Sequence, residues 1–191
     1  TEEVKLNTGN IAVNEFISDE NDLGVTSEYF VKESIDIETV EIRVNISHSW
    51  RGDLNLYLES PNGIISELVR ESNDGNDHYR EWTFSSVVHW DENSFGLWKL
   101  KVNDTEAGTA GTWNDWNITF YGYPEKDSDS DGLPDYAEFI IGTGFNNPDW
   151  DNDGLLDGEE YYGWFDLQGN FHYTDLKDFD SDDDDVNDWY E

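Results

Sequence analysis

The sequence predicts an all-β fold, a jelly-roll β-sandwich of about eight strands, followed by a loop-rich C-terminal tail. Three observations predict this fold. Short segments alternate apolar with polar residues, the links between them are polar and contain glycine, and acidic residues are densest toward the C-terminal end. The N-terminal part lacks the period of three to four residues that marks an amphipathic helix.

Strict alternation assigns successive side chains to opposite faces of a strand. The clearest run follows Thr39, where Val40, Ile42, Val44 and Ile46 share one face. Equally regular runs cover residues 54–58, 98–102 and 116–120. Weaker candidates cover residues 11–17, 28–31, 64–69 and 81–87. Eight short strands with polar links are typical of two antiparallel sheets packed face to face.

The composition excludes several classes of protein. The chain has 191 residues and no cysteine, which excludes disulfides, thiol catalysis and cysteine-ligated zinc. No apolar run reaches the roughly 18 residues of a transmembrane helix. The formal net charge of −35 repels nucleic acid and anionic membranes, so we expect no nucleic-acid partner and no membrane insertion. Nine Trp, ten Tyr and ten Phe are too much aromatic surface for a disordered chain.

The charge distribution predicts two domains. Residues 125–191 carry 22 acidic and 2 basic residues, whereas residues 1–124 carry 23 and 8, so the net charges are −20 and −15. We therefore expect a sandwich at 1–124 and a separate tail at 125–191. The sequence begins at Thr1 without an initiator methionine or an apolar leader, so we expect a fragment or a processed product.

The tripeptide Arg51-Gly52-Asp53 admits two interpretations. It is a cell-adhesion signal if it lies on a protruding, mobile loop. It is a strand entrance if Asp53 directly precedes the core-facing leucines of residues 54–58, whose strand ends at the turn Ser60–Gly63. We favour the strand entrance.

The segment DSDSDGLPDYAE, residues 127–138, is the sharpest motif in the tail. Side-chain oxygens stand at loop positions 1, 3, 5, 9 and 12, which are Asp127, Asp129, Asp131, Asp135 and Glu138. Gly132 at position 6 permits a sharp turn, and Leu133 at position 7 offers its backbone carbonyl. Calcium takes six to eight oxygen ligands, and this spacing wraps them around one point.

The same pattern occurs twice more. The second loop offers Asp149, Asp151, Asp153, Leu155, Asp157 and Glu160, and the third offers Asp180, Asp182, Asp184, Val186, Asp188 and Glu191. Asp185 replaces glycine in the third loop and tolerates the turn less well, so we expect that loop to be looser or to use other ligands. The sequence thus predicts two to three calcium ions or more.

Two other readings of the tail are weaker. A solvated acidic face does not place glycine and an apolar residue at fixed offsets between aspartates. EF-hand or dockerin repeats require a long helix after each loop, but only residues 139–141 precede the breakers in GTGFNNP. Without metal, the clustered carboxylates repel each other, so some protonate or the loop spreads.

Four segments together resemble the P domain, or homo-B domain, of kexin-type and related subtilisin-like proteases. They are GDLNLYLESPNG (52–63), WTFSSVVHW (82–90), GLWKLKVND (96–104) and GTWNDWNITFYG (111–122). The resemblance covers residues 5–123 and implies a sandwich that packs on a catalytic domain and supports its folding, stability or specificity. Members often carry Gly-Asp-Leu at 52–54, in accord with the strand entrance. They usually have glycine at the place of Asp91, so we expect a different loop shape there.

The tail segment EFIIGTGFNNPDWDNDGLLDGEE, residues 138–160, resembles thrombospondin type 3-like calcium repeats of secreted microbial proteins. The resemblance covers residues 127–160 and part of 178–191, and it implies stacked loops that can share metals. Residues 161–174 contain seven aromatic rings, six from Phe, Trp and Tyr and one from His172. We expect them to form an apolar patch or a hairpin that links the loops.

These observations predict a non-catalytic chain. The four histidines fit no metal-binding pattern, and there is no Gly-x-Ser-x-Gly nucleophile elbow. We expect a calcium-binding C-terminal domain of a secreted or cell-surface subtilisin-like serine protease, with its catalytic domain as the intramolecular partner. The alternative is an attachment module for a polysaccharide or a surface protein, whose exposed aromatic rings stack on sugars. Its candidate residues are Trp50, Trp90, Trp113 and Trp150.

Overall fold

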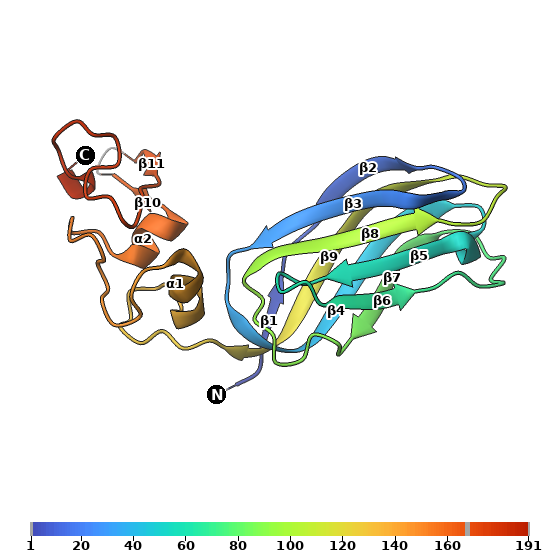
Figure 1. Ribbon diagram of the computed structural model, residues 1–191, viewed down its shortest axis with the longest axis horizontal. Coiled ribbons are helices and arrows are strands. Elements are labelled where there is room, and N and C mark those ends of the chain that lie inside the picture. Colours follow the sequence, from blue (N-terminus) through green and yellow to red (C-terminus); the bar gives the residue numbers. More distant parts are fainter. Residues whose placement is uncertain (1, 167–168, 191) are drawn as a thin grey trace. The chain divides into compact units, whose positions relative to one another are not determined.

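The computed structural model describes residues 2–166 and 169–190 (Figure 1). The chain divides into two compact units, Thr1–Pro124 (unit 1) and Glu125–Glu191 (unit 2), and each is described by itself. In the described residues, no helix combines the length and the apolar character needed to cross a membrane.

Unit 1 is an all-β sandwich, as predicted. Its described strands are β1 (Val4–Asn7), β2 (Ile11–Ile17), β3 (Asn21–Val31), β4 (Ile35–His48), β5 (Leu54–Glu59), β6 (Ile65–Val69), β7 (Tyr79–Ser86), β8 (Gly96–Asp104) and β9 (Gly111–Pro124). One sheet has the order β1-β9-β4-β7, with β2 also paired to β9, and the other has the order β3-β8-β5-β6. These pairs are antiparallel, and Figure 1 shows the two layers facing each other.

The core lies between the two sheets, where the alternating side chains meet. Val40, Ile42, Val44 and Ile46 of β4 have no exposed surface, which confirms the face assigned to them. The opposite layer supplies Leu54, Leu56 and Leu58 from β5 and Trp98, Leu100 and Val102 from β8, all fully buried. Burying an aliphatic side chain contributes about 1.5–3 kcal/mol, so these inward rows hold the layers together.

Pairing extends the sheets beyond the segments that alternate. β3 begins at Asn21, well before the expected start at residue 28, because its polar first half pairs with β8 and matches Val25 to Val102. A register shift falls between Asn21 and Val25 and contains Gly24 at φ 62°. A Cβ at Gly24 would lie 2.3 Å from the carbonyl oxygen of Val102. The partner strand, rather than the local pattern, therefore fixes this half of β3.

The loop after β7 contains a buried polar contact. Asp91, where the resemblance leads us to expect glycine, has φ 65°, a left-handed conformation that favours glycine. The next residue, Glu92, is buried, with Oε2 2.8 Å from His89 Nδ1. Ser60 Oγ donates to Glu92 Oε1 at 3.0 Å. This carboxylate therefore ties the loop to the end of β5.

Arg51-Gly52-Asp53 forms a 3₁₀ turn, η1 (Arg51–Asp53), directly before β5. Gly52 and Asp53 are buried, and a Cβ at Gly52 would lie 2.4 Å from the carbonyl oxygen of Ser72. The guanidinium of Arg51 bonds Asp74, with 2.9 Å between Nε and Oδ2, and lies 4.8 Å from the ring centroid of Trp82. The tripeptide is therefore a strand entrance whose arginine is held within the fold.

Unit 2 consists of loops, two short helices and a small hairpin. The helices are α1 (Asp135–Ile141) and α2 (Asp157–Tyr162), and a 3₁₀ turn, η2 (Asp188–Tyr190), follows the third loop. α1 is capped at its C-terminal end by Gly142, whose φ is 91°. The expected hairpin over residues 161–174 is present as β10 (Trp164–Phe165) and β11 (Phe171–His172), with the rings of Phe165 and Phe171 4.7 Å apart.

Removing the arginine of the strand entrance should destabilise unit 1. We expect Arg51→Ala to lower the free energy of unfolding by about 1 kcal/mol, the scale of a partly desolvated cation–π contact. The check is urea unfolding followed by tryptophan fluorescence. Arg70→Ala is the matched control, because that side chain is exposed and its ion pair is with the nearby Glu67. Equal unfolding midpoints for the two variants would show that Arg51 does not hold the turn.

Candidate metal centre

The three acidic loops share one backbone conformation. Position 4 has positive φ in each loop, at Ser130 (65°), Asn152 (64°) and Asp183 (60°). Position 6 also has positive φ, at Gly132 (97°), Gly154 (111°) and Asp185 (72°). Glycine adopts this conformation at little cost, whereas aspartate is strained in it. The third loop therefore has the same turns as the first two, at the cost of strain at Asp185.

The first aspartate of each loop accepts hydrogen bonds from the backbone that curls around it. Oδ2 of Asp127 accepts from the N–H of Gly132 at 3.1 Å, and Oδ2 of Asp149 accepts from that of Gly154 at 3.2 Å. In the third loop, Oδ2 of Asp180 accepts from the N–H of Asp185. These bonds close each loop around its own carboxylates, so the sequence spacing alone sets this geometry.

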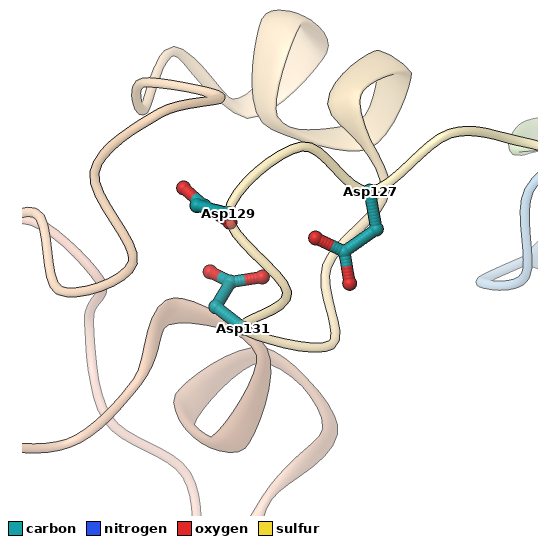
Figure 2. Close-up of side chains that lie close together, drawn as sticks. All are labelled: Asp127, Asp129 and Asp131. Carbon is teal, nitrogen blue, oxygen red and sulfur yellow. The ribbon is translucent and has the colours of Figure 1, made fainter.

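Positions 1, 3 and 5 converge within each loop. In the first loop, ligand oxygens of Asp127, Asp129 and Asp131 lie within 4.8 Å of one another. Figure 2 shows these three side chains on one curved stretch of the chain. The equivalent groups are Asp149, Asp151 and Asp153, and Asp180, Asp182 and Asp184.

Two further clusters join successive loops. Carboxylate oxygens of Asp131 and Glu138 in the first loop and of Asp157 in the second lie within 4.8 Å of one another, and all three residues are buried. Asp153 and Glu160 of the second loop likewise meet Asp188 of the third, and these are also buried. Positions 5 and 12 of one loop thus combine with position 9 of the next. Sequence reasoning assigned position 9 to its own loop and missed this exchange.

Many of these buried carboxylate oxygens have no hydrogen-bond partner among the described residues. They include both oxygens of Asp129, both of Glu138, and Oδ2 of Asp131 and Asp157. The second loop adds Oδ1 of Asp149, Oδ2 of Asp151 and Asp153, and Oε2 of Glu160. An isolated buried charge costs far more than a paired one. Oxygens in this state fit a bound cation.

The acidity of these groups reflects their crowding. Burial, reinforced by the charges of Asp129 and Asp131, raises the pKa of Glu138 to about 8. Burial also raises the pKa of Glu160 to about 8 and that of Asp131 to about 6. Burial likewise raises the pKa of Asp153 to about 6. A cation removes the cause, because it favours the ionised form of every carboxylate that it contacts.

The ligand set fits calcium best. It consists of carboxylate oxygens with flexible spacing, which suits a hard cation with six to eight ligands. Magnesium needs a tight octahedron and keeps much of its water. Zinc prefers nitrogen and sulfur ligands, and the chain has no cysteine.

The remaining predicted ligands have different surroundings. Both oxygens of Asp135 accept hydrogen bonds from Ser128, at 2.7 Å each, and Asp135 belongs to none of the clusters found among the described residues. The side chains of Leu133 and Leu155 are buried, whereas Val186 is 40% exposed. Glu191 lies outside the described residues.

The four candidate sugar-stacking residues do not form one platform. Trp113 is fully buried, and its indole N–H donates to the carbonyl oxygen of Asp115. Trp50, Trp90 and Trp150 are exposed. Trp50 and Trp90 follow opposite ends of the antiparallel pair β4–β7, and Trp150 belongs to unit 2. The expectation of a four-tryptophan platform is therefore wrong, because strand phase directs Trp113 into the core.

Unit 1 contains the residues that match a known family. Residues 37–120 match the family model described as "Proprotein convertase P-domain". The dibasic-processing endoprotease of Schizosaccharomyces pombe is 40% identical over 101 residues, which are 51% of this chain and 14% of that protein. Kexin of Saccharomyces cerevisiae is 41% identical over 88 residues, or 45% of this chain and 11% of that protein. The chain thus spans only a small part of these relatives.

A solved structure supports the fold. A serine protease of Aeromonas sobria aligns with a TM-score of 0.58 at 20% identity, over 64% of this chain and 28% of that one. At this identity the likeness concerns the fold alone. The family model ends at residue 120, before the acidic loops, so the metal centre rests on its own chemistry.

Without metal, the stability of unit 2 should fall as the pH rises. Glu138 and Glu160 have pKa values of about 8 when folded, against 4.5 for an ordinary glutamate. Their protonated forms thus stabilise the fold fully below the lower value, and this contribution disappears as the pH approaches the higher one. We expect chelated protein to resist proteolysis of residues 125–191 better near pH 5 than near pH 8.

The control for this experiment is the double variant Glu138→Gln/Glu160→Gln, which is neutral at both positions and should lose most of the pH dependence. Calcium should reverse the trend, because the ion binds the ionised carboxylates. Equal resistance of the chelated wild-type chain at both pH values would contradict the prediction.

Proposed function

Residues 37–120 form a proprotein convertase P domain, and from this premise we propose that the chain is a non-catalytic part of a subtilisin-like serine protease whose unit 2 binds calcium. The observation that carries the calcium proposal is the convergence of buried, unpartnered carboxylate oxygens from successive loops. The P domain supports the assignment to a protease, because the relatives that share it are named as proteases.

The proposed role of calcium is to order unit 2. Without the ion, like charges at Asp131, Glu138 and Asp157 oppose the packing of the first loop on the second. With the ion, the same carboxylates attract a common centre and hold the loops together. A ligand at about 100 times its dissociation constant stabilises the folded form by about 2.7 kcal/mol per site. Unit 2 is then folded wherever calcium is abundant.

This dependence fits a protein that works outside the cytosol. Extracellular calcium modules bind with dissociation constants of about 10⁻⁴–10⁻³ M, so they fill after secretion and stay empty where calcium is scarce. We therefore propose a secreted or cell-surface protease as the parent. Unit 1 then packs on the catalytic domain of that parent protease. Unit 2 adds a part of the protein whose folded state is stabilised by calcium.

The sugar-binding form of the attachment-module alternative lacks its four-tryptophan surface. It needed several exposed tryptophans on one surface, and Trp113 is in the core.

A calcium titration of the whole chain tests the proposal. We expect calorimetry to detect at least two bound ions in about 0.1 M salt. Asp157→Asn should weaken one of these sites about tenfold or more, because it removes a charge from a fully buried cluster. Asp22→Asn is the matched control, since it makes the same charge change at an exposed residue of unit 1. Absence of calcium binding at millimolar concentration would refute the proposal.

A double-mutant cycle tests whether the loops share an ion. Glu138→Gln and Asp157→Asn lie in different loops but in one cluster, so we expect their effects on calcium affinity to be non-additive. Additive losses would mean that the two loops bind separate ions. Magnesium, titrated in the same way, should bind more weakly.

A further inference from the structure

A second candidate site lies in unit 1, far in sequence from the calcium loops. A cavity of about 650 Å³ opens where β5 begins and β8 ends, between three loops that include residues 50–53, 71–73 and 106–109. This is the right-hand end of the sandwich in Figure 1. Ligand sites commonly have volumes of about 300–1,000 Å³, so the cavity is large enough for an extended side chain.

The lining of the cavity is strongly acidic. Asp53, Glu71 and Glu106 contribute three carboxylates, and none of the lining residues is basic. Asp53 is only 9% exposed. Its Oδ2 accepts one long hydrogen bond, from Thr109 Oγ1 at 3.3 Å, and no described residue bonds its Oδ1. A nearly buried carboxylate that lines a cavity with an unused oxygen fits a positively charged ligand.

Arg70 precedes Glu71 and interacts with it electrostatically, but its exposed guanidinium bonds Glu67. Two other basic groups beside the lining residues are engaged elsewhere. Arg51 is paired with Asp74 and lies over Trp82 and Tyr79. The imidazole of His48 is fully buried, with Nε2 3.1 Å from Asp104 Oδ2. Arg51 and His48 therefore do not neutralise the carboxylates of the lining.

The loops that carry the cavity are held in place. The N–H of Ser72 donates to the carbonyl oxygen of Gly52 at 2.7 Å, and the N–H of Gly52 donates to that of Asp74 at 3.0 Å. Oε2 of Glu71 accepts from Thr105 Oγ1 at 2.6 Å. A site built on such fixed loops loses little entropy when it binds a ligand.

The arrangement favours an organic cation over a metal ion. Among the described residues, every group of three acidic side chains that converges within 4.8 Å lies in unit 2. The three carboxylates of the cavity therefore do not converge on one point as those of unit 2 do. Trp50, 47% exposed, adds an aromatic wall, and an indole face attracts guanidinium or ammonium groups.

We propose that this cavity binds a positively charged side chain, arginine or lysine, of a peptide segment. Asp53 and Glu71 pair with the charged head, Glu106 adds to the negative field, and Trp50 packs on the stem or the head. A neutral sugar would leave the carboxylates uncompensated. The site lies in unit 1 and does not depend on calcium binding by unit 2, so either proposal can fail without the other.

The test uses the full chain in about 2 mM calcium, which keeps the acidic loops of unit 2 occupied. The probe is the peptide acetyl-Gly-Arg-Gly-amide, and its neutral counterpart carries citrulline in place of arginine. The readout is the NMR shift of the Gly108 and Thr109 amides, which report on the lining of the cavity. We expect saturable shifts with the arginine peptide and binding at least about tenfold weaker with citrulline.

Matched variants locate the site. Glu71→Gln keeps an oxygen for the Thr105 bond but loses the charge, and should weaken arginine binding about tenfold. Glu15→Gln, at an exposed position of β2, should have no effect. Trp50→Ala should weaken binding several-fold, whereas Trp90→Ala, at the opposite end of β7, should not.

Several results would overturn the proposal. They are equal binding of the arginine and citrulline peptides, unchanged affinity in Glu71→Gln, or no shift of Gly108 and Thr109 at millimolar peptide. A shift of the same amides by cellobiose but not by the arginine peptide would identify a sugar site instead. Raising the salt to about 0.5 M should weaken arginine binding, because partly exposed charges are screened.

Discussion

The repulsion between buried carboxylates is the constraint on which unit 2 depends. Asp131, Glu138 and Asp157 approach within 4.8 Å, and most of their oxygens have no hydrogen-bond partner among the described residues. In ordinary proteins such groups are paired or solvated. The loops can keep this packing only if protons or a cation offset the charge. The raised pKa values of Glu138 and Glu160 mean that these groups hold protons more readily than ordinary glutamates. The set of carboxylate oxygens also fits a bound cation.

Unit 1 is organised by a different principle. Its apolar rows meet between two sheets, and three of its carboxylates line a cavity formed by loops at one end of the sandwich. Residues 51–53 serve both the fold and the cavity. The guanidinium of Arg51 fixes the entrance to β5, and Asp53 lines the cavity beside it. A motif that can serve as an adhesion signal elsewhere is here divided between a structural arginine and an acidic cavity wall.

The residues that match a known family and the residues that could bind a metal lie in different parts of the chain. Residues 37–120 match the P domain by sequence, and the acidic loops lie beyond that match. The loops are therefore interpreted from their own oxygens, spacing and burial. The family match and the acidic loops therefore occupy different parts of one chain, and the ligand chemistry of the loops does not depend on the domain beside them.

The sequence by itself determined the features that depend on local spacing. Alternation identified the core faces of β4, β5, β8 and β9, and the offsets between aspartates predicted the convergence of positions 1, 3 and 5 in each loop. Only the tertiary structure decided the start of β3, the exchange of Asp157 and Asp188 between loops, and the cavity lined by Asp53, Glu71 and Glu106. The reason is physical. Spacing fixes which side chains of one segment share a face or a turn, whereas contacts between segments depend on how strands pair and loops stack.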